Sequence, residues 1–155
     1  MASSTLLQCL NDGSDFGPST TNRRQTEIFL ASAAVAVGDA VSLDFSKTED
    51  SDKALYITPT DVDVTTADCC IGVVLRSVET DGALTAGSRI EVVTRGIVNT
   101  KVHTDTDEPG HVMIAGGTAG QLGPNGAAAS QYPTVGVSAA AQAGGFAMVY
   151  IFNNF

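Results

Sequence analysis

The chain has 155 residues, which is enough for one domain that buries a core without disulfide or metal staples. Eight Lys and Arg stand against 17 Asp and Glu, so the formal net charge of -9 disfavours sequence-independent binding to nucleic acid or to an anionic membrane. Only 16% of the residues are charged and 6% aromatic. Gly, Ala, Ser, Thr and Val dominate instead, which favours strands and turns over long amphipathic helices.

The first 25 residues are polar, carry the turn signals Asp12-Gly13 and Gly17-Pro18, and show no sustained periodicity. They are predicted to form an extended N-terminal arm, followed by a single β domain over residues 26–155. The short apolar stretch Leu6–Leu10 lacks the basic start and the length of a signal-peptide core. No apolar run approaches the roughly 20 residues of a membrane-spanning helix, so we expect no membrane partner.

From Thr26 onward the pattern changes to short segments of strand character. In the segment Ala40–Phe45 the last five residues alternate between apolar and polar, which predicts a half-buried strand with Val41, Leu43 and Phe45 facing inward. The segment from Lys47 to Lys53 is charged and is expected to be exposed. The other predicted strands are Glu27–Ala31, Ala54–Thr58 (ended by Pro59), Cys70–Leu75, Ile90–Thr94, Gly96–Val102, His111–Ala115, Thr134–Ser138 and Phe146–Phe152.

Turn signals separate these segments about every 8 to 12 residues, which is typical of an antiparallel sandwich or barrel. The predicted fold class is therefore all-β, an antiparallel β-barrel or β-sandwich with an extended N-terminal arm. The Gly-rich segment after Ala115 is interpreted as a turn, and Ala139–Ala143 as a short helix or a loop.

A weak internal repeat runs through the domain, with three segments recurring in the same order. Two similar β units closing on one core would explain this order, and so would chance similarity between Gly- and Val-rich stretches. The segments Gly38–Val41, Ile71–Val74 and Gly87–Val92 recur as Gly110–Met113, Val135–Ser138 and Gly144–Val149.

The three cysteines form no C-x-x-C pair, and an odd number cannot all pair within one chain. A secreted disulfide framework is therefore not expected. Cys69 and Cys70 would point to opposite faces of a strand and are interpreted as small hydrophobic residues.

The most enzyme-like segment runs from His103 to His111 and holds both histidines and three carboxylates. It matches neither the ligand spacing of zinc sites nor that of calcium loops, and a solvated acidic turn is the preferred interpretation. Residues 116–123 lack the Gly-Lys-Ser/Thr ending of a phosphate-binding loop, and no G-x-S-x-G motif occurs. The prediction is a non-enzymatic protein without a cofactor or a metal.

The basic residues are scattered, and only Arg23 and Arg24 are adjacent, so no nucleic-acid patch is expected. The polar arm that holds this pair could lie along another protein and add hydrogen bonds at a sheet edge. A disordered tail is the alternative. The residues nominated for partner binding are Phe16, Arg23, Arg24 and Thr26.

Three segments, Val35–Val41, Ile71–Leu75 and Gly87–Val98, resemble the small head decoration or capsid cement proteins of tailed bacteriophages. The resemblance covers roughly Val35 to Phe152 and consists of loose glycine and valine spacings. The long insert from Ser46 to Thr66 departs from the smaller family members.

The resemblance implies a barrel or sandwich protomer, often trimeric, that binds the outside of an expanded phage head and bridges neighbouring major capsid proteins. A virion structural protein of the capsid exterior, made in the host cytoplasm, is accordingly expected, with the major capsid protein and two copies of itself as partners. Interfaces of ordinary size would bind strongly enough for this role, because cyclic assembly repeats each weak contact several times. A carbohydrate- or receptor-binding β module of a tail or cell-surface assembly is the alternative.

Overall fold

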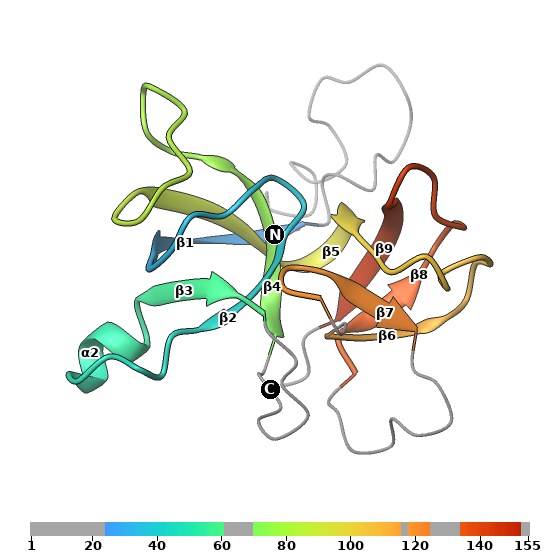
Figure 1. Ribbon diagram of the computed structural model, residues 1–155, viewed down its shortest axis with the longest axis horizontal. Helices are drawn as coiled ribbons and strands as arrows, with labels where there is room; N and C mark the ends of the chain where they lie inside the picture. The colour runs from blue at the N-terminus through green and yellow to red at the C-terminus, as the bar shows by residue number, and fades with distance from the viewer. Residues whose placement is uncertain (1–23, 61–69, 116–117, 125–133, 153–155) are drawn as a thin grey trace, which may run out of the picture.

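The computed structural model describes residues 24–60, 70–115, 118–124 and 134–152, and these are nearly all in strands and turns, which confirms the all-β prediction (Figure 1). A single short helix, α2, interrupts the strands in this part of the chain. The elements are β1 (Gln25–Ala31), β2 (Ala40–Leu43), α2 (Asp50–Lys53), β3 (Tyr56–Pro59), β4 (Cys70–Ser77), β5 (Arg89–Lys101), β6 (Val112–Ala115), β7 (Leu122–Pro124), β8 (Gly136–Ser138) and β9 (Phe146–Phe152).

Five strands close into a barrel, which we call unit 1. Their order is β1, β3, β2, β4 and β5, and the ring is closed because β5 also pairs with β1. The pairing of β1 with β3 is parallel, and the other four pairings are antiparallel. Closure removes the free sheet edges that would otherwise invite pairing with other chains.

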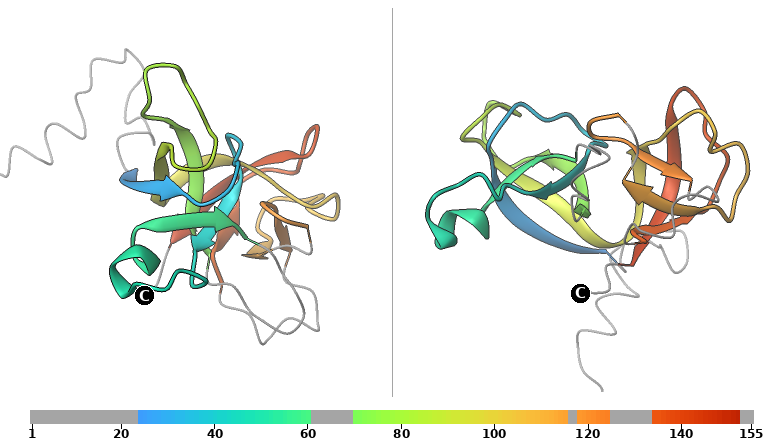
Figure 2. Two further views of the ribbon diagram at one scale, coloured as in Figure 1. Left: turned by 60° about the vertical axis from the view of Figure 1, so that its left-hand side comes forward. Right: turned by 60° about the horizontal axis from the view of Figure 1, so that its bottom comes forward.

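The second half of β5 leaves this barrel and begins another ring, unit 2, which continues through β9, β8, β6 and β7. A parallel bridge between Val102 and Leu122 brings β7 back to the end of β5, and the His103 N–H donates to the Leu122 carbonyl. Gly96, at φ 110°, lies where β5 passes from one unit to the other. The two rings lie side by side in the right-hand view of Figure 2.

The strand pairing of unit 2 repeats that of unit 1 in the same register. In unit 1, Ile57 of β3 pairs with Leu43 of β2 and, in parallel, with Ala31 of β1. In unit 2, Leu122 of β7 pairs with Ala115 of β6 and bridges Val102 in parallel. Pro59 and Pro124 occupy the same place in the two units, opposite Val41 and Met113.

Glycines mark the same positions in both halves. The N–H of Gly38 donates to the Val74 carbonyl, and the N–H of Gly110 donates to the Ser138 carbonyl in unit 2. Both glycines have positive φ, at 86° and 93°, a conformation that L side chains rarely adopt. The segments that recur in the sequence therefore occupy equivalent places in the two units.

Each unit has its own buried cluster. The core of unit 1 gathers Ala31, Val35, Val41, Ile57, Ile71, Val74, Ile90 and Val92. The core of unit 2 gathers Val98, Val102, Met113, Leu122, Val135, Ala147, Val149 and Ile151, together with Ala40, Cys70, Val73 and Val93 from the outer surface of unit 1. The units are therefore packed together through an apolar contact as well as joined by β5.

Polar contacts also link the units. Asp39, which precedes β2, pairs with the Lys101 ammonium at 2.5 Å and also accepts the Ala36 N–H. The Gly38 carbonyl accepts both the Lys101 N–H and the Thr100 hydroxyl. These contacts place the turn before β2 against the end of β5.

Several sequence predictions about individual elements are wrong. Phe45 does not face inward, because β2 ends at Leu43 and Phe45 lies in the following turn with 61% of its surface exposed. The segments 90–94 and 96–102 are one continuous strand, β5, except that residue 102 lies in an isolated bridge. Pro59 is the last residue of β3, whereas the prediction placed it just after the strand.

Two elements differ from the loops predicted for them. The segment after Ala115, interpreted as a turn, contains β7, whose Leu122 is fully buried. The charged stretch 47–53 is exposed or half-buried, as expected, and contains helix α2. Residues 139–143 contain no helix. Gln25 belongs to β1 and not to an arm, and the rest of the predicted arm, apart from Arg24, lies outside the described residues.

Candidate functional site

Of the four residues nominated for partner binding, Arg24 and Thr26 are described, whereas Phe16 and Arg23 lie outside the described residues. The structure brings Arg24 and Thr26 to one carboxylate, that of Glu91 on β5. The Arg76 guanidinium on β4 hydrogen-bonds this carboxylate at 2.5 Å, and the Thr26 hydroxyl is a further partner. The Arg76 hydrogen bond is the main cause of a lowered pKa at Glu91, and the Thr26 hydroxyl and the charges of Arg76 and Arg24 act in the same direction.

Two ends of the described chain meet close to this cluster. Gln25, at the start of β1, and Phe152, at the end of β9, both pair with Arg95 of β5. The first and the last described strands, β1 and β9, therefore begin and end at the same place, between unit 1 and unit 2.

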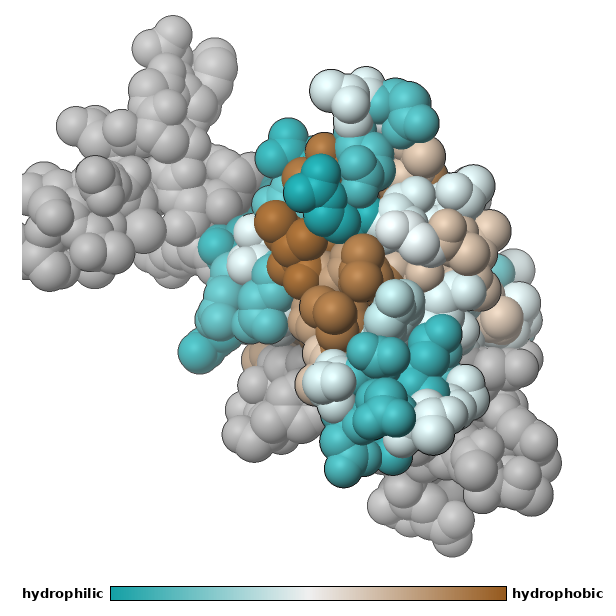
Figure 3. Space-filling view, turned by 90° about the vertical axis from the view of Figure 1, so that its left-hand side faces the viewer, coloured by the Kyte–Doolittle hydropathy of each residue, from teal (hydrophilic) through white to brown (hydrophobic). Residues whose placement is uncertain are grey.

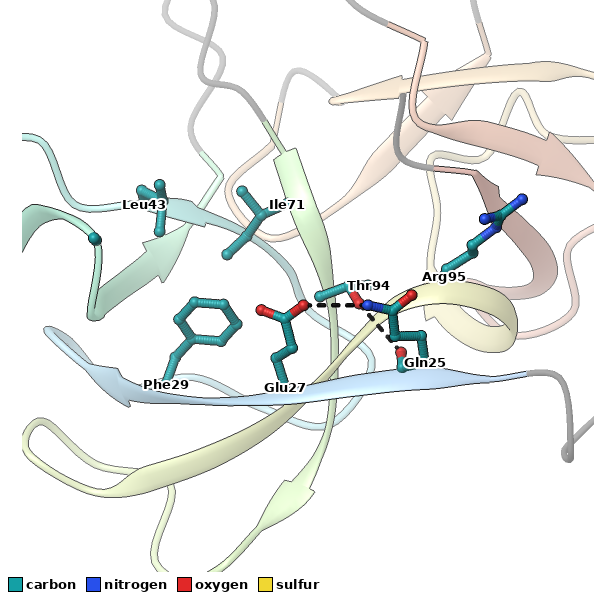
Figure 4. A pocket seen from close by; sticks show the side chains of 8 residues that line it. Gln25, Glu27, Phe29, Leu43, Ile71, Thr94 and Arg95 are labelled. Atoms are coloured by element: carbon teal, nitrogen blue, oxygen red, sulfur yellow. Dashed lines mark hydrogen bonds between the residues drawn. The ribbon is translucent and has the colours of Figure 1, made fainter. Parts of the chain in front are cut away.

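A cavity of about 380 Å³ opens at this end of unit 1, and we call it the mouth of unit 1 (Figure 4). Phe29, Leu43 and Ile71 form its apolar side, and they point toward one another in Figure 4. Polar groups form the other side. The mouth is lined by Gln25, Glu27, Phe29, Leu43, Ala54, Ile71, Thr94 and Arg95.

The polar side of the mouth is held by one hydrogen bond within β1 and one between β5 and β1. The Gln25 amide donates to the Glu27 carboxylate at 3.4 Å, and the Thr94 hydroxyl donates to the Gln25 carbonyl at 3.3 Å. Both side-chain groups stay accessible, because Gln25 and Glu27 are exposed. The mouth can therefore offer an apolar side next to a negatively charged group, Glu27, and a positively charged group, Arg95.

Sequence reasoning did not nominate the mouth, although one signal was present. Gln25, Glu27 and Phe29 alternate along β1 and so share the face that becomes the interior of the barrel. A carboxylate at an inward position of a strand is unusual unless that position opens to solvent. Thr94 and Arg95 join the mouth only because β5 pairs with β1.

The acidic segment 103–111 separates into two histidine-carboxylate pairs. His103 lies 3.3 Å from Asp105, and His111 lies 3.2 Å from Asp107. Glu108 contributes its backbone carbonyl to the Ser138 hydroxyl. Within the described ranges, no three His, Cys, Asp or Glu side chains come together as metal ligands would.

Cys70 is buried, whereas Cys9 and Cys69 lie outside the described residues. Cys70 packs in the core of unit 2 from the outer surface of unit 1. The interpretation of this residue as a small hydrophobe agrees with its burial.

Asp44, which follows β2, carries a carboxylate that accepts several hydrogen bonds. The Ser32 hydroxyl donates to it, as do the hydroxyl and the N–H of Ser46. These bonds, led by the one from Ser32, hold the pKa of Asp44 below its usual range against the opposing effect of partial burial, and the nearby Lys47 ammonium contributes in the same direction.

This network predicts a pH-dependent contribution to stability. A carboxyl group with a lowered pKa in the folded state stabilises the fold above its unfolded pKa of about 4, and that contribution disappears as the pH falls through the folded pKa. The variant Asp44→Asn should therefore be less stable than the wild type at pH 7, by about 1 to 2 kcal/mol, and the difference should shrink below about pH 4. Urea unfolding at a series of pH values measures both quantities.

Ser32→Ala is the matched control for this prediction, because it removes the first donor and leaves the carboxylate in place. It should show the same trend with a smaller amplitude. A difference between Asp44→Asn and wild type that stays constant from pH 7 to about pH 2 would contradict the assignment.

Within the described residues, no helix is long and apolar enough to span a membrane. No family model matches the chain, and none of the curated proteins matches it.

Proposed function

We propose that this chain is a virion structural protein, a decoration or cement subunit that binds the outer surface of a phage head and stabilises contacts between major capsid proteins. In this role the protein acts as a homotrimer and needs interface area, not chemistry. The resemblance of its glycine and valine segments to head decoration proteins supports this role, as does the exposed surface of unit 1.

The surface of unit 1 is the observation that carries the proposal. A band of hydrophobic residues lies between two hydrophilic margins on the face shown in Figure 3. Exposed apolar area with a polar rim is typical of surfaces that bind other proteins. The exposed large apolar side chains of unit 1 are Ile28, Val37, Phe45, Leu55 and Val78.

The N-terminal segment is the second contact in this proposal. It joins the described chain between the two units, beside Arg24 and Glu91. Its 23 residues can span at most about 75 Å, which is enough to reach a neighbouring subunit on a shell. Phe16 and Arg23 are the residues of this segment that we assign to the contact.

A deletion of residues 2–23 tests the proposal and leaves β1 intact. The variant should unfold at the same urea concentration as the wild type but lose co-sedimentation with expanded empty heads of the phage that encodes it. The charge-neutralising variant Arg23→Gln is a milder test and should weaken co-sedimentation without abolishing it. Undiminished binding of the deletion variant would rule out the arm, and no binding of the wild-type protein would rule out the proposal.

The mouth of unit 1 favours a carbohydrate-binding module as the second candidate. An aromatic ring, Phe29, lies in this cavity beside hydrogen-bonding groups such as Gln25 and Glu27, a combination found in small-ligand sites. A glycan screen separates the two functions. Binding of a glycan that Phe29→Ala removes would favour this candidate over the capsid role.

A further inference from the structure

Within the chain, unit 1 covers the end of unit 2 that corresponds to the mouth of unit 1. We call this end the mouth of unit 2. Ala40, Val73 and Val93 pair with one another in a row across β2, β4 and β5. All three are fully buried, although they lie on the outer surface of the unit 1 barrel, because they pack in the core of unit 2. We call this row, with Cys70, the wall of unit 1.

The residues of unit 2 that this wall covers correspond to the mouth of unit 1. By strand register, Val98 takes the place of Glu27, and Thr100 that of Phe29. Val135 takes the place of Ile71, because Gly136 pairs with Met113 as Gly72 pairs with Val41. The three unit 2 residues are buried, at 3%, 0% and 2% exposure.

The same two surfaces recur without a covering partner among the described residues. The mouth of unit 1 is an open cavity of about 380 Å³. On unit 2, Val112, Val137 and Tyr150 form a row across β6, β8 and β9 in the register of Ala40, Val73 and Val93. This row, with Thr134, is the wall of unit 2.

The wall of unit 2 is exposed where the wall of unit 1 is buried. Val112 and Tyr150 are exposed to 40% and 39%, whereas the equivalent Ala40 and Val93 have no exposed surface. Met148 adds a further exposed apolar side chain on β9. An apolar row at a position that serves as an interface elsewhere in the same chain indicates a second interface.

The two uncovered surfaces, the mouth of unit 1 and the wall of unit 2, are both more polar than their covered counterparts. The mouth of unit 1 has Glu27 where unit 2 has Val98, and is therefore more polar. The wall of unit 2 has Tyr150 where unit 1 has Val93, and Thr134 where unit 1 has Cys70, which adds two hydroxyl groups. Hydroxyls on the wall can pair with the carboxylate and amide of the mouth, so the surfaces remain complementary.

We propose that the wall of unit 2 in one copy of the chain docks over the mouth of unit 1 in a second copy, as the wall of unit 1 docks over the mouth of unit 2 within each chain. The contact joins two different surfaces and is therefore heterologous. Repeated heterologous contacts close into a ring if the rotation allows, and otherwise grow into a filament. The proposal concerns self-association alone and does not depend on binding to a phage head.

Complementation between two variants tests the pairing of surfaces. Tyr150→Asp places a charge on the wall and Glu27→Arg puts a second positive charge beside Arg95 in the mouth, and both positions are exposed enough to tolerate the change. Each variant alone should associate at least 10-fold more weakly than wild type in sedimentation equilibrium. A mixture should form a one-to-one dimer and no larger species, because one intact wall and one intact mouth remain.

Val78→Ser is the matched control. Val78 has a similar exposed fraction, 37%, and follows β4 at the opposite end from the mouth residue Ile71, so this variant should associate like wild type. Circular dichroism and urea unfolding check that every variant is folded.

Two results would overturn the proposal: a wild-type chain that remains monomeric up to about 1 mM, or one variant alone that associates as strongly as wild type. If the wild type is monomeric and deletion of residues 2–23 makes it an oligomer, this segment, and not a second copy, covers the mouth in the intact chain. Failure of capsid binding with successful complementation would leave self-association standing and remove only the proposed binding to the phage head.

Discussion

Replacing Gly72 with alanine should lower the free energy of unfolding by about 3 kcal/mol, a large part of the stability of a domain of this size. A Cβ atom at this position would overlap the carbonyl oxygen of Val93 and the side chain of Val92 on the neighbouring strand. Moving the backbone in the middle of a closed barrel costs free energy, because the strands are packed on both sides, and β4 and β5 would have to separate. Urea unfolding of Gly72→Ala against wild type measures the loss.

The repeated strand register extends this prediction to unit 2. A Cβ atom at Gly136 would overlap the Tyr150 carbonyl oxygen in the same manner, so Gly136→Ala should be destabilised to a similar extent. Gly82→Ala is the control, because Gly82 has positive φ but nothing within 4 Å of the added atom. It should cost only about 1 kcal/mol of backbone strain. Equal losses at Gly72 and Gly82 would show that crowding between strands is not the cause.

The second large effect should follow from Leu122→Ala in β7, with a loss of about 3 kcal/mol. Leu122 is fully buried in the core of unit 2, and its backbone bridges Val102 and accepts the His103 N–H. Truncation leaves a cavity at the point where the second ring closes. Because there is no Trp, the tyrosine fluorescence and the far-ultraviolet circular dichroism are the two signals to follow in urea.

The same experiment tests whether residues 26–155 form one domain. The units share β5 and are linked by the ion pair between Asp39 and Lys101, so Leu122→Ala should shift a single transition seen by both signals. Leu55→Ala is the control, since Leu55 is exposed and its truncation should change stability by less than about 0.5 kcal/mol. Two separate transitions in Leu122→Ala would show that unit 2 unfolds independently of unit 1.

Local sequence patterns were sufficient to predict a strand where the residues of the strand itself determine its position. The alternation from Val41 to Leu43, the apolar run Cys70–Leu75 and the turn glycines predicted strands that the structure contains. Phe45 was assigned to the interior because the alternation continues through it. The chain turns away from the sheet at Asp44, whose carboxylate binds Ser32 and Ser46, and no pattern of apolar residues reports that contact.

The candidate site was less accessible to sequence reasoning than the fold. Arg24 and Thr26 were nominated for partner binding, and only Arg24 as part of the arm. In the structure both act on Glu91, a residue that the sequence did not single out, Thr26 through a hydrogen bond and Arg24 through its charge. The mouth combines residues of β1, β2, β4 and β5 with Ala54, which are far apart in the chain. Only the closure of the barrel, through the pairing of β1 with β5, brings them to one cavity.

The sequence by itself determined the β class, most strand positions and the order of the recurring segments, because these depend on side-chain alternation and on glycine and proline within a few residues. Tertiary structure decided which apolar rows are buried. Val93 and Tyr150 occupy equivalent positions on outward faces, yet the first is buried and the second exposed. The physical reason is that burial of an outward face depends on the element that covers it, and unit 2 covers Val93 within the chain, whereas no described element of the chain covers Tyr150 to the same extent.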